Sequence, residues 1–336
     1  MHETKLIKTL RTLNRKELGE LLRFSQSGLV TITDKGQELL ELIHSCSPAF
    51  TSPRLKKEQL FTKLFKGDPY NDTKLRLLQS DLLKLANQYI STKMLLASSY
   101  EAEMLQLEHF IKAENNDYTL RRIDEFTRKV DAIPYQNENY FYLRFRVEQM
   151  KSNYFAKRSK DYALDALFKN LEAFYFLNKL KLFCVRISNN LIYRNEPDHS
   201  FLEEIRQSLE NQAFPDNQII LGYSYSILLL TGEDTELQFR RLFELLQQFE
   251  KQLGPHEVNT FNKILENHCI RQINTGNEEY YEMLFMLLER RLLKAHEIAS
   301  GEVKTFITLC IRMGKDMLAQ KFLKDKKQSI VPAEIR

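Results

Sequence analysis

Glycine and proline are scarce in this sequence, with ten glycines and eight prolines among 336 residues. These two residues form turns and interrupt helices, so their scarcity leaves few positions at which a helix must end. Leucine, lysine, glutamate and glutamine, which all favour helices, are abundant instead. The composition therefore predicts an all-α protein.

A large excess of one charge is lacking as well, and so is any close pair of cysteines. The 49 basic and 45 acidic residues leave a formal charge of +4, which is too balanced to attract a polyanion along the whole chain. Cys46, Cys184, Cys269 and Cys310 lie far apart without a CxxC motif. This spacing is typical of reduced, buried thiols in a cytoplasmic protein.

No stretch is apolar over the length of a membrane span. The longest apolar run, Ile219 to Leu230, contains Gly222, Ser224 and Ser226 and is far shorter than the roughly 20 residues that a span needs. It predicts a buried helix. The N-terminal MHETKLIKTLRTLNRK lacks the apolar core of a signal peptide. We therefore expect a cytoplasmic protein with no transmembrane segment.

Signatures of catalysis and of nucleotide or metal binding are also missing. The sequence contains no GxxxxGK loop, GxGxxG turn or HExxH motif. The nearest approach to a metal site is His268 with Cys269, but adjacent helical residues do not face each other and cannot hold one ion unaided. Because Cys269 follows Val258, Phe261 and Leu265 at helical spacing, we interpret it as a core residue. We expect no enzymatic activity, no cofactor and no bound metal.

Residues 1–96 predict a compact bundle of short helices with well-marked starts. Asn14 with Glu17 fits a capping box, in which each side chain satisfies an unpaired backbone amide. The Ser52–Pro53 pair is a second start signal. A third, longer helix follows, with leucines that recur every three or four residues: Leu75, Leu78, Leu82 and Leu85.

The segment SGLVTITDKGQELLELI, Ser27 to Ile43, allows a second interpretation. It resembles the wing strand and following helix of winged-helix DNA-binding domains. That fold needs about three helices before its wing, and only 26 residues precede Ser27. We therefore favour the helical bundle.

Residues 97–336 predict a series of amphipathic helices separated by polar turns. The turns recur about every 36 to 44 residues, which is the period of a helix–turn–helix repeat. We therefore expect an α-solenoid of helical hairpins after the N-terminal bundle. The turns are expected at Asn115–Asp117, Arg158–Lys160, Asn195–Asp198, Thr231–Asp234, Thr275–Asn277 and Gly314.

The segment NTGNEEYYEMLFMLLERRLL, Asn274 to Leu293, shows why stacked hairpins are expected. Gly276 suits the left-handed position that commonly ends a helix. Two apolar stripes run along the helix that follows: Tyr280, Leu284, Leu287 and Leu288 in one, and Tyr281, Phe285 and Leu292 in the other. Two stripes need two neighbours, which the hairpin partner and the next repeat supply.

Two resemblances support this architecture. RMGKDMLAQKFL, with its Ala319 and Phe322, is similar to helical repeats of the tetratricopeptide type, although the strict consensus spacing is missing. The chain also resembles an uncharacterised bacterial family of all-helical proteins, in PYNDTKLRLLQSDLLKLANQYI, YFLNKLKLFCVRISNN and ENHCIRQINTGNEEYYEMLF. The second resemblance covers most of the chain. It implies helical repeats and brings no activity or binding residues.

The helix KLKLFCVRISNNLIYR carries the candidate binding surface. One face is expected to be buried, and it holds Leu180, Cys184, Ile187 and Leu191. A second face holds the candidate binding residues Lys179, Arg186, Asn190 and Tyr193. A stripe that combines cations, an amide and an aromatic ring suits recognition of a peptide.

We therefore expect a scaffold or adaptor that binds another protein or a peptide on the curved surface of its repeats. The alternative is a nucleic-acid-binding helical-repeat protein, whose binding would weaken steeply with salt. Self-association is a further possibility, as are contacts of the basic segments KLIKTLRTLNRK and KFLKDKKQ with acidic lipid or nucleic acid. The nucleic-acid alternative would use the arginines Arg121, Arg122, Arg240, Arg241, Arg290 and Arg291.

Overall fold

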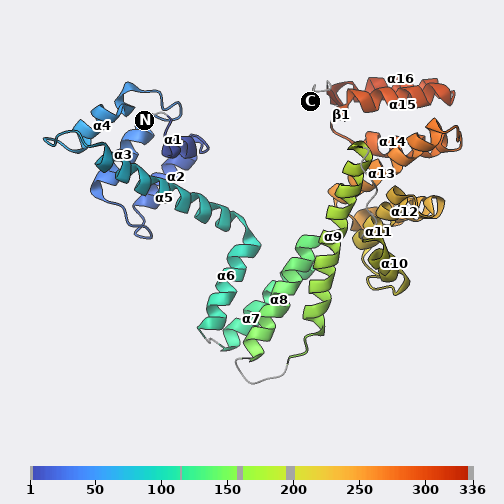
Figure 1. The fold of residues 1–336 in the computed structure, drawn as a ribbon, viewed down its shortest axis with the longest axis horizontal. Coiled ribbons are helices and arrows are strands. Elements are labelled where there is room, and N and C mark those ends of the chain that lie inside the picture. Colours follow the sequence, from blue (N-terminus) through green and yellow to red (C-terminus); the bar gives the residue numbers. More distant parts are fainter. Residues whose placement is uncertain (1–2, 114–115, 157–161, 194–200, 332–336) are drawn as a thin grey trace. The chain divides into compact units, whose positions relative to one another are not determined.

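The computed structural model describes residues 3–113, 116–156, 162–193 and 201–331. Within these ranges the chain forms sixteen α-helices and one pair of two-residue strands, so the prediction of an all-α protein is confirmed (Figure 1). None of the helices in these ranges is both long and apolar enough to cross a membrane. The chain divides into two compact units, Met1–His109 and Phe110–Arg336.

The division between the units falls inside a helix. The boundary predicted from the sequence lies after residue 96, one residue before the end of α5 at Ala97, and Ser98, with a ψ of 100°, leaves the helical conformation. The compact units instead divide between His109 and Phe110, within α6 (Ser99–Lys112). Because α6 continues through that point, no turn residue marks the division in the sequence.

Unit 1 is a bundle built on α5, which contacts the four preceding α-helices. The predicted capping box at Asn14 and Glu17 is confirmed, with both of its hydrogen bonds present. Ser52 starts a 3-10 helix rather than an α-helix. The elements of the unit are α1 (Lys5–Leu10), α2 (Arg15–Ser25), α3 (Asp34–Ser45), η1 (Pro53–Leu55), α4 (Lys57–Leu64), α5 (Asp72–Ala97) and the first part of α6.

The segment that resembles a wing contains no strand. Residues 27–33 form bends and irregular backbone, and α3 begins at Asp34. The Thr33 hydroxyl accepts a hydrogen bond from the Gly36 amide at 3.1 Å and caps that helix. The bundle interpretation therefore holds for these residues.

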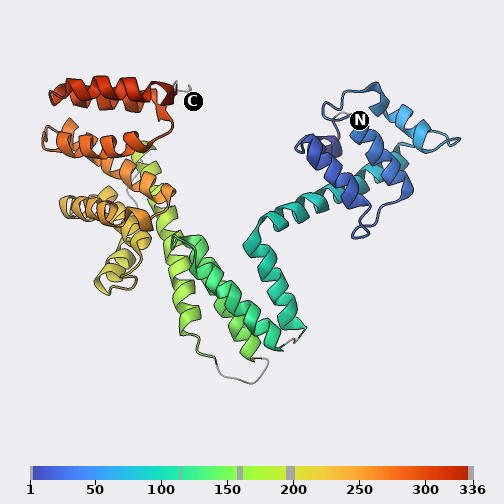
Figure 2. The ribbon, with the colours of Figure 1, turned by 180° about the vertical axis from the view of Figure 1, so that it is seen from behind.

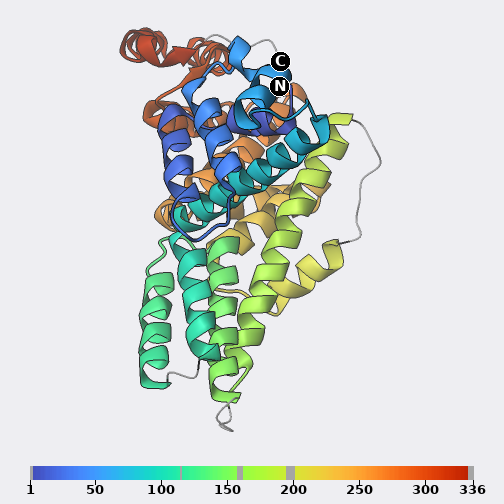
Figure 3. The same cartoon turned by 90° about the vertical axis from the view of Figure 1, so that its left-hand side faces the viewer.

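Unit 2 is a row of helices in which each packs against its neighbours in sequence. The helices α7, α8 and α9 lie side by side (Figure 3), and α11 packs against α9, α12 and α13. From α12 to α16 each helix contacts the next one (Figures 1 and 2). The α-helices are α7 (Asn116–Asp131), α8 (Glu138–Ala156), α9 (Asp165–Tyr193), α10 (Leu202–Glu210), α11 (Gln218–Thr231), α12 (Thr235–Phe249), α13 (Pro255–Asn274), α14 (Tyr280–Lys294), α15 (Ser300–Arg312) and α16 (Asp316–Lys326).

Three of the predicted turns are confirmed by glycines in the left-handed conformation. Gly232, Gly276 and Gly314 have φ values of 86°, 95° and 66°, and each follows the end of a helix. Their missing side chain removes the clash that other residues meet at positive φ. The turns expected at Arg158–Lys160 and Asn195–Asp198 lie outside the described residues, as does part of the one at Asn115–Asp117.

Two predictions of burial, one for α11 and one for α14, are confirmed. The apolar run from Ile219 is the buried helix α11. In α14, Leu284, Phe285 and Leu292 are all buried, because α13 covers one side of the helix and α15 another. A helix with two apolar stripes therefore has two neighbours.

The C-terminal part of unit 2 adds a feature that the sequence analysis does not contain. Ile298 and Ala299 (β1) pair in parallel with Ile330 and Val331 (β2). The 3-10 helix η3 (Lys327–Ser329) connects α16 to β2, and another 3-10 helix of this unit, η2 (Glu250–Gln252), lies between α12 and α13. The pairing joins the end of α16 to the connection before α15.

Candidate functional site

The helix α9 forms the base of the candidate site. It is 29 residues long, and no glycine or proline interrupts it. One face packs against α8 and α11 and is the predicted buried face, since Leu180, Cys184 and Ile187 are all buried. Leu191 lies in the helix, but its side chain is outside the described residues.

The four candidate residues all lie on α9, in the half nearer its C-terminus. Lys179, Arg186 and Tyr193 recur every seven residues and form one row along the helix. Arg186 is exposed, Asn190 is half-buried and Tyr193 is 73% exposed. The row is therefore accessible at Arg186 and Tyr193, and its role in binding stays a prediction.

Lys179 already has partners within the chain. Its Nζ donates to Glu204 Oε2 of α10 at 2.5 Å and lies 3.9 Å from the centroid of the Phe201 ring. Burial alone would lower the pKa of Lys179, but the hydrogen bond with Glu204 and the charge of that carboxylate outweigh burial and raise it. Lys179 is therefore a fixed cation at the edge of the face.

The same side of α9 carries a second apolar stripe, which the sequence analysis missed. Its members are exposed to solvent, with Leu182 at 72% and Phe168 at 57%. They recur at spacings of three, four or seven residues, with Asn178 between Tyr175 and Leu182, so they share one helix face, roughly opposite the buried one. That spacing is the signal that could have revealed the stripe from the sequence. Its members are Leu164, which directly precedes the first residue of α9, and Phe168, Leu171, Tyr175, Leu182 and Val185 within the helix.

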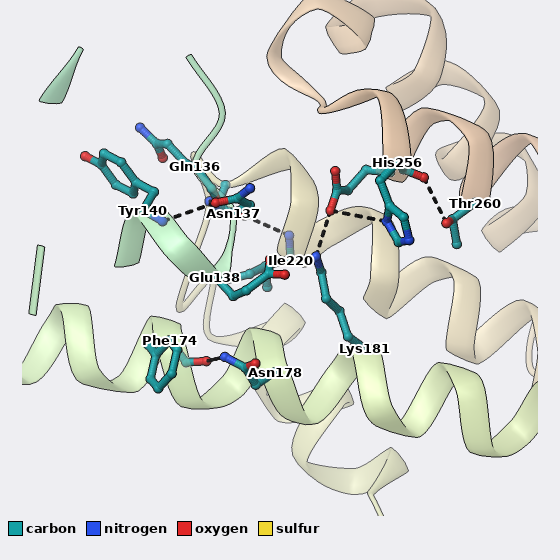
Figure 4. A network of polar contacts seen from close by, with 12 residues as sticks. Gln136, Asn137, Glu138, Tyr140, Phe174, Asn178, Lys181, Ile220, His256 and Thr260 are labelled. Carbon is teal, nitrogen blue, oxygen red and sulfur yellow. Dashed lines mark hydrogen bonds and ion pairs between the residues drawn. The ribbon is translucent and has the colours of Figure 1, made fainter. Parts of the chain in front are cut away.

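A buried ion cluster fixes α9 in unit 2 (Figure 4). Lys181 Nζ donates to Glu138 Oε2 at 2.6 Å and to Glu257 Oε1 at 2.7 Å. These two carboxylates come from α8 and α13, so one lysine joins three helices. Although burial would raise the pKa of Glu138, the hydrogen bond from Lys181 and its charge lower it.

A glycine leaves space for one carboxylate of this cluster, and hydrogen bonds of Asn217 hold the backbone nearby. A Cβ on Gly254 would lie 2.6 Å from Glu257 Oε2, so glycine leaves the space that this carboxylate occupies. Asn217 accepts from the Ile220 amide at 2.8 Å and donates to the Gln136 carbonyl at 3.0 Å, which ties α11 to the start of α8. Each of these groups is held by the chain itself, so we assign the cluster a role in positioning α9.

A groove of about 650 Å³ lies between α12, α13 and α14. Its cations are compensated from within the chain, because Glu250 accepts from Lys294 at 2.7 Å and also pairs with Arg290. The hydrogen bond from Lys294, together with Arg290, lowers the pKa of Glu250. The groove is therefore lined by the paired Arg290 and Lys294, by Lys251, and by apolar side chains such as Leu246 and Leu253.

The six arginines of the nucleic-acid alternative mostly have acidic partners. Four form ion pairs: Arg122–Glu125, Arg240–Glu236, Arg290–Glu250 and Arg291–Glu266. Of the other two, Arg121 donates to the Asp117 carbonyl and Arg241 lies 5.7 Å from the centroid of the Tyr225 ring. Pairing of this kind lowers the positive potential that a phosphate backbone would meet. Nucleic-acid binding stays a prediction, and the geometry gives it less support than protein binding.

Cys269 lies in the core of unit 2, as the spacing predicts, and His268 is buried beside it. The His268 ring packs against Phe239 in a tilted arrangement and edge-on against Tyr280, with centroids 5.3 and 5.6 Å away. Burial, and secondarily the charge of Arg271, lowers the pKa of His268 to about 4, while burial raises the pKa of Cys269 to about 12. No group of three or more metal-ligating side chains occurs in the part of the chain that the structure describes.

Comparison of the chain with protein-family models, with curated proteins and with solved structures gives no match. The function is therefore inferred from the residues and their arrangement.

Proposed function

We propose that this protein is a cytoplasmic protein–protein interaction scaffold or adaptor without catalytic activity. Its binding surface is the exposed face of α9, which carries the apolar stripe with Lys179, Arg186, Asn190 and Tyr193 beside it. The observation that carries the proposal is that stripe, because contiguous exposed apolar side chains mark interaction surfaces.

The energetics of the stripe support a protein partner. Burying one large apolar side chain contributes roughly 1.5–3 kcal/mol, so the six exposed members of the stripe offer enough to offset the entropy lost on association. Arginine and tyrosine are also enriched among the residues that dominate binding energy at protein interfaces. A groove-binding helix or another helical surface fits such a face.

We further propose that unit 2 is an α-solenoid of the tetratricopeptide type. Successive contacts from α11 to α16 and left-handed glycines after α11, α13 and α15 support this reading. One element departs from the hairpin period, because residues 165–193 form a single helix. In this proposal α9 is the long helix against which the hairpins begin to stack.

A site-specific photo-crosslinker in place of Val185 tests the proposal in the cells that make the protein. Val185 lies in the stripe and is exposed, so we expect crosslinks to protein that Leu182→Lys abolishes. The matched control carries the crosslinker at Ile311, an exposed apolar residue of α15. No protein crosslink at Val185 above that control would contradict the proposed function.

A further inference from the structure

The exposed stripe of α9 follows the seven-residue pattern of a coiled-coil seam. Positions a hold Phe168, Tyr175 and Leu182, and positions d hold Leu164, Leu171, Asn178 and Val185. Positions a and d in a heptad repeat face a partner helix and interlock with its side chains. The expected occupant of this face is therefore another long helix that lies along α9.

No element of the described chain covers this seam. Within unit 2, α8 and α11 make the most extensive contacts with α9, and they cover the opposite face, where Leu177, Leu180 and Ile187 are buried. A helix of this length spans about 43 Å at 1.5 Å per residue. The partner must therefore supply a helix of similar length.

The charges beside the seam identify that partner. The e positions, seven residues apart, hold Asp165, Glu172, Lys179 and Arg186. The acids therefore lie in the first half of α9 and the bases in the second. An e position flanks the seam and meets e positions of an antiparallel partner. A row that is acidic at one end and basic at the other is complementary to itself when the second helix runs in the opposite direction.

We propose that α9 binds α9 of a second copy of this chain in an antiparallel coiled coil. The inference rests on the proposed function, because it names the partner of the same surface. A two-fold axis relates the two helices, so each copy contributes the same residues to both halves of the interface.

The a and d pattern and the charges select one register. In it, Phe168 faces Val185 of the second copy, Leu171 faces Leu182, and Glu172 lies beside Lys179. A shift by one heptad would bring either Glu172 or Lys179 against its own symmetry mate, which places like charges together. Asn178 at a central d position further restricts the register, as buried polar residues in coiled coils do.

A parallel arrangement is disfavoured by the same charges. In a parallel pair an e residue meets the g residue of the preceding heptad, which sets Glu172 beside Leu167 and Lys179 beside Phe174 of the second copy. The two charges then find no opposite charge, whereas the antiparallel register pairs them. Lys179 can keep its bond to Glu204 while it faces Glu172, because an ammonium group donates up to three hydrogen bonds.

Sedimentation velocity of the full chain tests the association. We expect a concentration-dependent species with twice the mass of one chain, and we expect Leu182→Lys to raise its dissociation constant by at least about tenfold. Leu182 is exposed, so this change leaves the core intact, and unchanged circular dichroism verifies that. Ile311→Lys is the matched control and should leave the association unchanged.

A charge exchange tests the orientation. Glu172→Lys alone and Lys179→Glu alone should each weaken self-association by about tenfold, since each sets like charges together. An equimolar mixture of the two variants should restore it, because every e-position contact in the mixed dimer is again between opposite charges. Recovery in the mixture supports the antiparallel register, and no recovery overturns it.

The remaining outcomes separate this inference from the proposed function. A wild-type chain that stays monomeric at its highest soluble concentration overturns the inference, as does a dimer that Leu182→Lys leaves intact. If the crosslinker at Val185 then joins the chain only to a different protein, the proposed function stands and the second copy is the wrong partner. If it joins the chain to no protein, both proposals fail.

Discussion

Lys181 is the residue on which the placement of α9 depends. Its side chain is only 18% exposed, and its ammonium group lies between the carboxylates of Glu138 and Glu257. Glu257 is 4% exposed, so its charge has little access to water and depends on the lysine. A buried cluster of this kind specifies one arrangement of the three helices that carry it.

Replacing Lys181 with methionine should therefore destabilise unit 2 strongly. The change leaves two carboxylates close together without a cation, and we expect a loss of roughly 3–5 kcal/mol in the free energy of unfolding. Chemical denaturation followed by circular dichroism measures it. Lys169→Met, at an exposed position of the same helix, should change stability by less than about 0.5 kcal/mol.

The cluster also predicts a compensating change. Glu257→Gln in the Lys181→Met background removes one of the two unpaired charges and should recover part of the lost stability. If the stability losses of Lys181→Met and Glu257→Gln simply add in the double variant, the unpaired carboxylates are not the cause of the loss.

His268 makes stability depend on pH. Burial holds the pKa of its imidazole at about 4 in the folded chain, against an ordinary value of 6.5. The unfolded chain therefore binds a proton at higher pH than the folded chain does. The contribution of neutral His268 to stability is fully present above pH 6.5 and is lost as the pH drops from 6.5 towards 4. The total loss in the free energy of unfolding is about 3 kcal/mol.

His268→Phe removes this titration and keeps a ring in the aromatic cluster. We expect the free energy of unfolding to fall less between pH 7 and pH 4.5 than in the wild type, as measured by urea denaturation at each pH. His296→Phe, at an exposed position, is the control. A pH dependence of His268→Phe identical to that of the wild type would show that this group is not the cause.

At the scale of the element, close packing between α11 and α13 depends on a single glycine. A Cβ on Gly222 would lie 2.4 Å from the ring of Phe261, which is fully buried and packs edge-on against Tyr223. Glycine inside a helix normally costs stability relative to alanine. Its presence here is explained by the approach of the two helices.

Gly222→Ala should therefore destabilise the protein, by about 1–3 kcal/mol from overpacking. Gly19→Ala provides the opposite case, because Gly19 is also helical but has open space around it. That change should stabilise its helix by about 0.5–1 kcal/mol. Thermal unfolding of both variants measures whether each change raises or lowers stability. A gain in stability from Gly222→Ala would contradict the close contact between Gly222 and Phe261.

The element scale also shows what sequence patterns can reveal. The turns at Gly232 and Gly276 follow from local residue preferences, and the buried stripe of α9 follows from helical spacing. From the sequence, Lys179 and Tyr193 are predicted to belong to a polar recognition stripe. The apolar seam that begins at Leu164 is not predicted. Periodicity shows that a stripe exists, but whether α8, α11 or solvent meets it depends on residues distant in the chain.

At the scale of the whole molecule, the two units have separate cores. Leu39 belongs to the core of unit 1 and Leu284 to that of unit 2, and both are buried. Compact units with their own cores can unfold as separate cooperative transitions. A change in one core should then affect only the unit that contains it.

We expect Leu284→Ala to lower the stability of unit 2 by about 2–5 kcal/mol and Leu39→Ala to lower that of unit 1 by a similar amount. Hydrogen exchange followed by mass spectrometry assigns each loss to its unit. A loss below about 1 kcal/mol for Leu284→Ala would show that the stripe of α14 is not buried. Equal loss of protection in both units from either variant would contradict separate unfolding.

By itself the sequence determined the all-helical character, several of the turns, and the buried sides of helices such as α9 and α14, because these depend on residues within a few positions of one another. Only the tertiary structure decided that α9 is covered on one apolar face and open on the other. It also decided that Lys181 meets carboxylates from two other helices, and that Ile298 pairs with Ile330. These features depend on which distant segments of the chain come into contact, and short-range periodicity does not determine those contacts.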